Sequence, residues 1–245
     1  MEVRLIAMTD VMCNDVPKGA LFSPEQVCNF AARTCTSEDA GTMAGTWYVE
    51  DESVPVWNDL DMKSLMAAMK SGHESVLEHA VFTFEVKGVS RALTHQLVRH
   101  RIASYSQQSQ RYVKITDMDG YVIPKSVDEW NMLNDYCSIM GEIWEYYDRL
   151  IKAGVPVEDA RYILPNACTT NIIITMNARE LRHFFSLRCC ERAQWEIREL
   201  ANRMLKICKE VSPIIFEWAG PRCAQLGYCP EAKGCGRMPK KEVDR

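Results

Sequence analysis

The chain has 245 residues and a mass of 28.0 kDa, enough for one large domain or two small ones. Its net charge of −4 disfavours a protein that binds nucleic acid over its whole surface, although a local basic pocket is compatible with it. We find neither a secretory signal pattern nor an apolar run long enough to cross a bilayer, so we expect a cytoplasmic protein without a membrane partner. Its 11 Cys should be mostly reduced and buried as small apolar side chains.

The first segments predict structure but not function. Val3–Met8 is typical of a short buried strand. The capping box Ser23–Gln26, with Pro at the first helical position, predicts a helix over Pro24–Cys35. Gly41–Asp51 should be a loop, and the apolar spacing predicts a second helix over about Asp59–Lys70.

Ser71–His79 contains two His and two Glu, residue types that bind zinc and iron. However, His73 and His79 are six positions apart, which does not place them on one helix face. We therefore expect no metal here. The simplest alternative is a turn that leads into a strand, and a second alternative is that these polar groups line a ligand pocket.

The next segments lead into an unusual basic stretch. Val81–Val86 predicts a strand, Lys87-Gly88 a turn, and Ser90 the N-cap of a helix over Arg91–Arg101. Tyr105–Tyr112 is typical of an irregular loop. The expected core positions on the helix are Leu93, Leu97 and Ile102.

Arg99, His100 and Arg101 are followed by Ser and Gln residues and then by Arg111, and no Asp or Glu occurs between Val86 and Thr116. The guanidinium fork suits phosphate or carboxylate. We therefore predict a phosphorylated ligand between Arg99 and Arg111. The alternative is that these Arg side chains are solvated, or pair with carboxylates distant in sequence.

The second half alternates helices with a strand. Ser126–Glu129 is a capping box, and it should begin an amphipathic helix that reaches Lys152 and stops at Gly154. Its aromatic stripe indicates a core or a subunit interface. A short helix over Val157–Leu164 and a buried strand over Thr169–Met176 should follow.

Asn177 can N-cap the next helix, which carries several basic side chains, and another amphipathic helix should run from Gln194 to Val211. We expect one catalytic domain over residues 1–216 and a Gly- and Pro-containing tail over residues 217–245. In that tail Cys223, Cys229 and Cys235 are spaced six apart, a weak signal for a metal or redox role; the alternative is a loosely ordered end. The sequence has no Rossmann or P-loop motif.

Several motifs together resemble the flavin-dependent thymidylate synthases. They are Gly72-His-Glu-x-x-x-Glu-His79, Arg99-His-Arg followed after seven residues by Ser109, Ala160-Arg161, Asn177-Ala-Arg179, Leu187-Arg188 and Ala193-Gln-Trp-Glu196. The resemblance covers roughly Val3–Phe216. It implies an α+β fold with an antiparallel β-sheet flanked by long helices, and a homotetramer whose active sites are each built from several chains.

The implied reaction is the reductive methylation of dUMP to dTMP. Methylenetetrahydrofolate would donate the one-carbon unit, FAD would carry electrons, and NADPH would reduce the flavin. The resemblance implies Arg188 as the catalytic residue, which favours ionisation of the uracil ring. Ser109 has no neighbouring base in the sequence, so we interpret it as a binding residue, and we expect neither a Ser nor a Cys nucleophile.

The other residue roles also follow from the resemblance. The implied cofactor-binding residues are His73, Ser75, Glu78, Arg99, His100, Arg101, Gln107, Asn177, Ala178, Arg179 and His183. The implied substrate-binding residues are Gln96, Arg99, Gln107, Gln108, Ser109, Gln110, Arg111, Arg161 and Arg188. No metal is implied.

The sequence departs from the family pattern at three positions. Gln107 stands where many relatives have Glu, and Cys35 where some have Ser near the flavin. Ser75 stands where relatives often have Thr. Two other classes of function remain as alternatives: a nucleic-acid-binding module that uses residues 91–111, and a metalloprotein that uses the Cys-containing tail.

Overall fold

A computed structural model of the chain describes residues 1–10, 23–36, 62–115 and 120–240. The loop expected at Gly41–Asp51 and the start of the helix expected from Asp59 lie outside these residues. The chain divides into two compact units: unit 1 contains residues 1–4 and 85–174, and unit 2 contains residues 5–84 and 175–245. The boundary expected at residue 216 stays a prediction.

The β-structure is an open antiparallel sheet of four strands in the order β1-β2-β4-β3. The strands are β1 (Glu2–Met8), β2 (Val81–Ser90), β3 (Ala103–Gln107) and β4 (Thr169–Asn177). β1, β2 and β4 each continue from one unit into the other, and β3 belongs to unit 1. Every second side chain of β2 from Phe82 to Val86 is buried, as expected for a strand with one covered face. The sheet and the many helices confirm the α+β fold.

Unit 1 contains α3 (Arg91–Leu97), α4 (Lys125–Glu129), α5 (Leu133–Lys152), α6 (Val157–Ala160) and the 3₁₀ helix η4 (Arg161–Ile163). The Oγ atom of Ser90 accepts a hydrogen bond from the backbone N–H of Leu93 at 3.0 Å, which confirms the predicted N-cap of α3. The long helix α5 buries Met140, Trp144 and Tyr147 from the predicted aromatic stripe.

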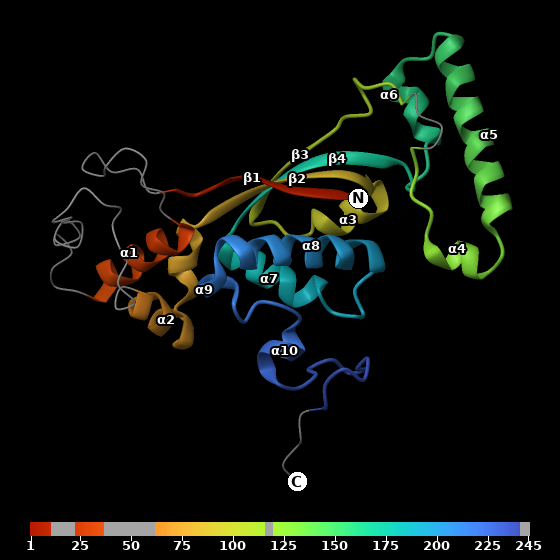
Figure 1. Cartoon of the computed structure of the whole chain (residues 1–245). Coiled ribbons are helices and arrows are strands. Elements are labelled where there is room, and N and C mark those ends of the chain that lie inside the picture. The colour runs from red at the N-terminus through yellow and green to blue at the C-terminus, as the bar shows by residue number, and fades with distance from the viewer. Residues whose placement is uncertain (11–22, 37–61, 116–119, 241–245) are drawn as a thin grey trace. The chain divides into compact units, whose positions relative to one another are not determined.

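Unit 2 contains α1 (Pro24–Thr36), α2 (Lys63–Lys70), the 3₁₀ helix η3 (Glu74–His79), α7 (Ala178–Arg188), α8 (Trp195–Val211), α9 (Pro213–Phe216) and α10 (Arg222–Leu226). Helices α7 and α8 pack side by side (Figure 1). The ring of Phe216 meets Phe82 of β2 and Phe185 of α7 edge-on, with centroids 5.5 and 6.0 Å apart. The aromatic side chains thus join strand and helices in one core.

The sequence predicts that the strand ends in a turn at Lys87-Gly88. In the structure β2 continues through these residues to Ser90. Gly88 has a φ of +68°, a conformation that glycine adopts without strain, and its N–H donates to the Asn171 side chain at 3.3 Å. The glycine therefore allows the strand to continue rather than ending it.

The basic stretch also differs from expectation. Helix α3 ends at Leu97 instead of Arg101, and the Tyr105 hydroxyl donates to the carbonyl oxygens of Leu97 and His100 at 2.9 and 2.8 Å. Ile102, expected in the core, is 67% exposed. The first part of the expected loop is strand β3, whose Ser and Gln residues carry no apolar alternation to predict it.

The long helix predicted from Ser126 is two helices, since the chain breaks between α4 and α5 at Asn131, which has a φ of +56°. Trp130 lies at this break and is 79% exposed. The helix expected over Val157–Leu164 is one turn of α-helix followed by η4. These differences arise where local backbone geometry overrides a continuous apolar period.

Two expectations about composition can be compared with the structure. Six of the ten described cysteines are buried: Cys28, Cys168, Cys189, Cys208, Cys223 and Cys229. Burial raises the thiol pKa of Cys28 and Cys189 to about 12 and that of Cys168 to about 11. These three thiols therefore behave as packing groups. No helix in the described ranges is long and apolar enough to span a membrane.

Candidate active site

The predicted substrate strip, residues 107–111, begins at the last residue of β3 in unit 1. The Gln107 side-chain amide donates to the Thr94 and Thr170 hydroxyls at 3.4 and 3.3 Å. The backbone N–H of Gln108 donates to the Asn171 carbonyl at 2.9 Å. The sequence placed this strip in a loop, but its first residue is the end of a strand that α3 and β4 hold in place.

Three Arg side chains of unit 1 gather around this strip. Arg91 donates through Nη2 to the Gln108 carbonyl at 3.1 Å. Arg111 binds the Glu158 carboxylate through Nε and Nη2 at 3.0 and 2.9 Å. Arg161 donates through Nε to the backbone carbonyl of the same Glu158 at 2.9 Å. Three segments separated in sequence thus bring their guanidinium groups to one region of unit 1.

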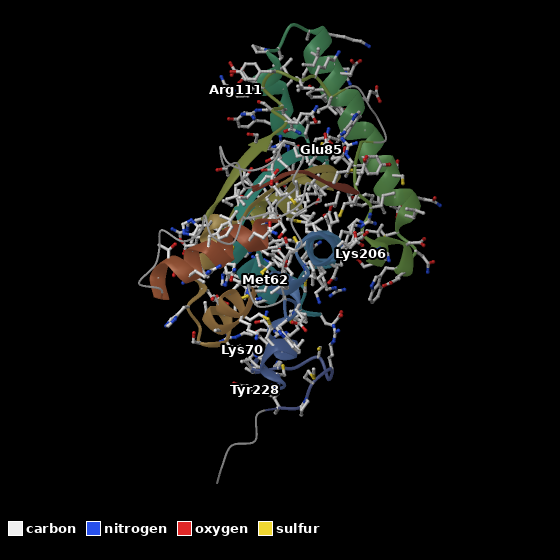
Figure 2. The ribbon with its side chains drawn as sticks, turned by 60° about the vertical axis from the view of Figure 1, so that its left-hand side comes forward. Met62, Lys70, Glu85, Arg111, Lys206 and Tyr228 are labelled. Carbon is white, nitrogen blue, oxygen red and sulfur yellow. The ribbon has the colours of Figure 1, made fainter. Side chains whose placement is uncertain are left out.

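Arg111 has the distant carboxylate partner that the sequence left as an alternative. The side chains of Arg111 and Glu158 are about half exposed, at 52% and 50%, and Figure 2 shows Arg111 at the edge of the fold. An exposed ion pair contributes about 0–1 kcal/mol, whereas a charge-assisted hydrogen bond to a ligand contributes about 1.5–3 kcal/mol. A ligand phosphate can therefore replace Glu158 on Arg111.

Three buried donors of unit 1 have no hydrogen-bond partner among the described residues: Arg91 Nε, Gln110 Nε2 and Trp144 Nε1. Gln110 belongs to the strip, and Arg91 donates to it. Burial lowers the pKa of the Arg91 guanidinium, and the nearby Arg161 charge lowers it further while Cys168 opposes this. Because unpaired buried donors destabilise a fold, they indicate a place where a polar ligand can bind. Sequence reasoning missed Arg91 as a site residue, although it lies within the stretch that has no Asp or Glu.

The turn Arg99-His100-Arg101 presents its residues in two directions. His100 is 5% exposed and lies under the turn fastened by Tyr105, while Arg99 and Arg101 are exposed. The guanidinium groups of Arg99 and Arg101 are therefore accessible to a ligand, whereas the His100 side chain is buried. Gln96, one helical turn earlier, is partly exposed.

The predicted flavin-binding residues of unit 2 lie on two elements that pack together, η3 and the N-terminal turn of α7. Arg179 of α7 and Glu78 of η3 form an ion pair at 2.5 Å. Asn177 caps α7, because its Oδ1 accepts from the Glu180 N–H at 2.9 Å. The structure thus joins the motif around residue 78 to the motif around residue 177, which the sequence placed 99 positions apart.

The other predicted flavin-binding residues of unit 2 differ in how exposed their side chains are. The exposed side chains are those of His73, Ser75 and His183. Ala178 is buried, and its N–H already donates to the Ala80 carbonyl at 2.8 Å. The side chain of Ala178 therefore has no surface for a cofactor. Cys35, near the end of α1, is exposed.

Arg188 lies at the other end of α7, where it lines a cavity of about 310 Å³ together with Arg192 and Arg222. Burial lowers the pKa of the Arg188 guanidinium, but arginine remains a cation at neutral pH. A partly desolvated cation acts more strongly on a developing negative charge than a solvated one. In the part of the chain that the structure describes, no group of three His, Cys, Asp or Glu side chains is placed to hold a metal ion.

The site residues thus form one cationic set in unit 1 and a second set on α7 and η3 in unit 2. Guanidinium groups gathered in this way are suited to phosphate-bearing ligands. Residues 20–214 match the family described as thymidylate synthase complementing protein, Thy1. The chain belongs to this family.

Curated relatives agree with that assignment over most of their length. A flavin-dependent thymidylate synthase of Geobacter sulfurreducens is 58% identical over 173 residues, which cover 69% of this chain and 74% of the relative. One from Pyrococcus furiosus is 49% identical, with 82% and 87% covered. One from Clostridium tetani is 46% identical, with 88% and 90% covered.

Proposed function

We propose that this chain is a flavin-dependent thymidylate synthase, which converts dUMP to dTMP by reductive methylation. The observation that carries the proposal is the family match over residues 20–214, together with relatives of that name at 46–58% identity. The proposed co-substrates are methylenetetrahydrofolate, as one-carbon donor, and NADPH, as reductant. The resemblance of the Arg99–Ser109 motif supports both.

The proposed dUMP phosphate site is the strip Gln107–Arg111 with Arg91 and Arg161. The unpaired donors Arg91 Nε and Gln110 Nε2 support it, because a phosphate supplies acceptors that the described protein does not. Ser109 contributes binding: its Oγ accepts from the Arg111 N–H at 3.2 Å, so it shapes the strip. Gln96 and Arg99 extend the proposed nucleotide site.

The chemistry of the donor set fits a flavin dinucleotide. Unit 1 offers the exposed cations Arg99 and Arg101. Unit 2, taken by itself, offers Arg179 with His73, Ser75 and His183, which are cations and neutral donors suited to a diphosphate and a ring system. Bound FAD supplies the redox chemistry, which no side chain of this set can supply. The protein's own contribution is to bind and orient the flavin.

Arg188 is the proposed catalytic residue. Its guanidinium stabilises negative charge that develops on the uracil ring, and one such interaction typically lowers a barrier by about 3 kcal/mol. No nucleophilic Ser or Cys is needed in this scheme. The thiol of Cys189, the residue next to Arg188, has a pKa raised to about 12 by burial and is therefore a poor nucleophile.

The proposed assembly is a homotetramer with active sites shared between chains, in the cytoplasm, with neither nucleic-acid nor membrane partners. The net charge of −4 and the described helices, none of which could span a membrane, support the last two points. The alternative of a nucleic-acid-binding module would need a basic surface, which this charge disfavours.

The test is a turnover assay with purified protein. The protein should bind FAD, and with dUMP, methylenetetrahydrofolate and NADPH it should form dTMP. Arg188→Ala should retain FAD, because the proposed flavin set lies at the other end of α7, and should lose dTMP formation by about 10²-fold or more. A protein that takes up no FAD contradicts the proposal, and full turnover in Arg188→Ala removes Arg188 from the catalytic role.

A further inference from the structure

The C-terminal segment of residues 221–240 follows a defined path in unit 2 with almost no apolar core. Its two buried residues are both cysteines, Cys223 and Cys229. The apolar Leu226 of helix α10 is exposed. Short segments that cannot bury apolar surface are usually held by disulfides or by a structural metal ion.

Four cysteines line one cavity in this region, the cavity of about 310 Å³ that Arg188 also lines. Cys223 comes from α10, Cys229 and Cys235 come from the segment that follows, and Cys190 lies two residues beyond the end of α7. Helix α10 packs against α7, so the fourth thiol comes from an element far away in the sequence. The sequence spacing revealed only the three thiols of the tail.

The tail folds back so that its thiol-bearing segments approach each other. A Cβ atom built on Gly234 would lie 3.3 Å from the Cys229 sulfur, which places the residue before Cys235 against Cys229. The N–H of Cys229 donates to the Pro239 carbonyl at 2.7 Å. Arg192 meets Glu231 at 3.3 Å, and Arg237 meets Glu191 at 3.5 Å, which fastens the tail to the segment that carries Cys190.

We propose that Cys190, Cys223, Cys229 and Cys235 bind one zinc ion that fastens the C-terminal tail to the end of α7. Four thiolates and no imidazole form a closed structural zinc site, with Zn–S distances of about 2.3 Å. Among the described residues, no three candidate ligands lie close enough together to hold a metal ion. Zinc binding must therefore bring the four thiols closer to one another. Exposed Cys235 can turn toward the buried pair by rotation of its side chain. Each thiol that binds releases its proton to water.

Cys190 follows Arg188 by two residues, so the ion would bind beyond the C-terminal end of α7. The proposed flavin residues Asn177 and Arg179 lie at the N-terminal end of the same helix. The role of the ion is to hold the C-terminal end of α7 against α10. The proposal does not depend on the thymidylate synthase activity, because zinc content and coordination are measured without turnover.

The first experiment is elemental analysis and zinc X-ray absorption of the full-length, FAD-containing protein, expressed without a metal-affinity tag and kept reduced. We expect about one zinc per chain with a shell of four sulfur atoms. Cys223→Ser and Cys229→Ser should lose this zinc, whereas Cys35→Ser and Cys137→Ser, outside the cavity, should retain it. Zinc-free protein, iron with sulfide in place of zinc, or equal zinc in all four variants overturns the proposal.

A second experiment uses the unaltered protein, because Cys variants can fail to fold. Trypsin should cleave at the exposed tail residues Lys233 and Arg237 faster after zinc is removed with a chelator. Addition of Zn²⁺, but not Mg²⁺, should restore protection, since thiolates bind zinc and not magnesium. Unchanged cleavage after chelation of zinc-containing protein contradicts a structural role, and a disulfide among these four cysteines in freshly purified reduced protein excludes the site.

Discussion

At the scale of single residues, the proposed nucleotide site is prepared by carboxylates that a ligand can displace. The carboxylate of Glu158 pairs with the Arg111 guanidinium, and the backbone carbonyl of Glu158 accepts a hydrogen bond from Arg161. Glu78 holds Arg179 in the same way in unit 2. Both ion pairs are half exposed, so separating them is inexpensive in free energy. The guanidinium groups are thus kept in position before a phosphate arrives, which reduces the entropy lost on binding.

Arg111→Ala tests this arrangement. The variant loses a charge-assisted hydrogen bond of about 1.5–3 kcal/mol, so dUMP should bind about 10- to 100-fold more weakly. Isothermal titration of the FAD-loaded protein with dUMP measures the change. Deoxyuridine lacks the phosphate, so its affinity should be the same for the variant and the unaltered protein.

Arg203→Ala is the matched control, because Arg203 also forms an exposed ion pair, with Glu199 at 2.6 Å, and lies outside the proposed site. It should leave dUMP affinity unchanged. If Arg111→Ala binds dUMP as tightly as this control does, Arg111 does not contact the phosphate.

At the scale of elements, one buried carboxylate joins two helices of unit 2. Glu25 in the first turn of α1 is 4% exposed, and its Oε1 accepts from the N–H groups of Ile214 and Ile215 at 2.6 and 3.2 Å. Burial raises the pKa of this carboxyl, and the two hydrogen bonds oppose the shift only in part. Glu25 therefore satisfies the start of α9, but its charge is unfavourable there.

The sign of the pH dependence follows from the raised pKa. Between the unfolded pKa of about 4.5 and the higher folded pKa, the folded chain holds a proton that the unfolded chain has lost, so the free energy of unfolding falls as pH rises. Glu25→Gln keeps an oxygen acceptor without the charge. Urea unfolding of both proteins across this pH range should show the variant gaining stability relative to the unaltered protein as pH rises.

Glu25→Ala provides the contrast, because it leaves two buried N–H groups without an acceptor and should lower the free energy of unfolding by about 1–3 kcal/mol. A constant difference between Glu25→Gln and the unaltered protein at all pH values would mean that Glu25 does not titrate differently in the folded chain.

The N-cap of α7 separates a structural role from a binding role. Asn177→Ala should lower the free energy of unfolding by about 1 kcal/mol, whereas Asn177→Asp should preserve the cap, because Asp caps as well as Asn. Asp adds a negative charge beside the proposed flavin diphosphate, so Asn177→Asp should bind FAD more weakly at nearly unchanged stability. Denaturant unfolding of the flavin-free protein and fluorescence titration with FAD measure the two quantities.

Gln194→Ala is the control for this pair, because Gln194 caps α8 by accepting from the Glu196 and Ile197 N–H groups at 3.0 and 3.1 Å. It should lower stability and leave FAD affinity unchanged. Equal FAD affinity in Asn177→Asp and the unaltered protein would place the flavin away from the start of α7.

Elements with a strong local signal were predictable from the sequence, and those set by contacts distant in sequence were not. The caps at Ser90 and Asn177 lie where the sequence predicts them, whereas Gln194, predicted as the first residue of a helix, is the N-cap of α8. The end of α3 depends on the Tyr105 hydroxyl, and the break before α5 depends on one left-handed residue, Asn131. Neither effect leaves an apolar period in the sequence.

The same distinction applies to the site. Arg111 and Arg161 were predicted from family motifs, but the partner Glu158 and the donor Arg91 needed the packing of unit 1. Likewise, the spacing of the tail cysteines gave three thiols, and the cavity added Cys190 from beyond the end of α7. Motifs indicate which residue types matter, whereas the fold determines which of them meet.

At the scale of the whole molecule, large apolar side chains remain uncovered in unit 1. Trp130 is 79% exposed, and Tyr112 and Tyr162 are 80% and 82% exposed. Exposed aromatic side chains are typical of surfaces that partner chains cover. They support the proposed homotetramer, in which several chains contribute to each active site.

Mixed oligomers of one catalytically impaired variant and one variant with weak dUMP binding test whether sites are shared. Arg188 belongs to unit 2 and Arg111 to unit 1. If a site takes these residues from different chains, random assembly of Arg188→Ala and Arg111→Ala chains should restore both residues in about a quarter of sites. Co-expression with two different tags, sequential purification and a dTMP assay at low dUMP concentration measure the recovery. Each variant expressed alone with both tags is the control, and mixed oligomers no more active than these controls would show that one chain supplies both residues.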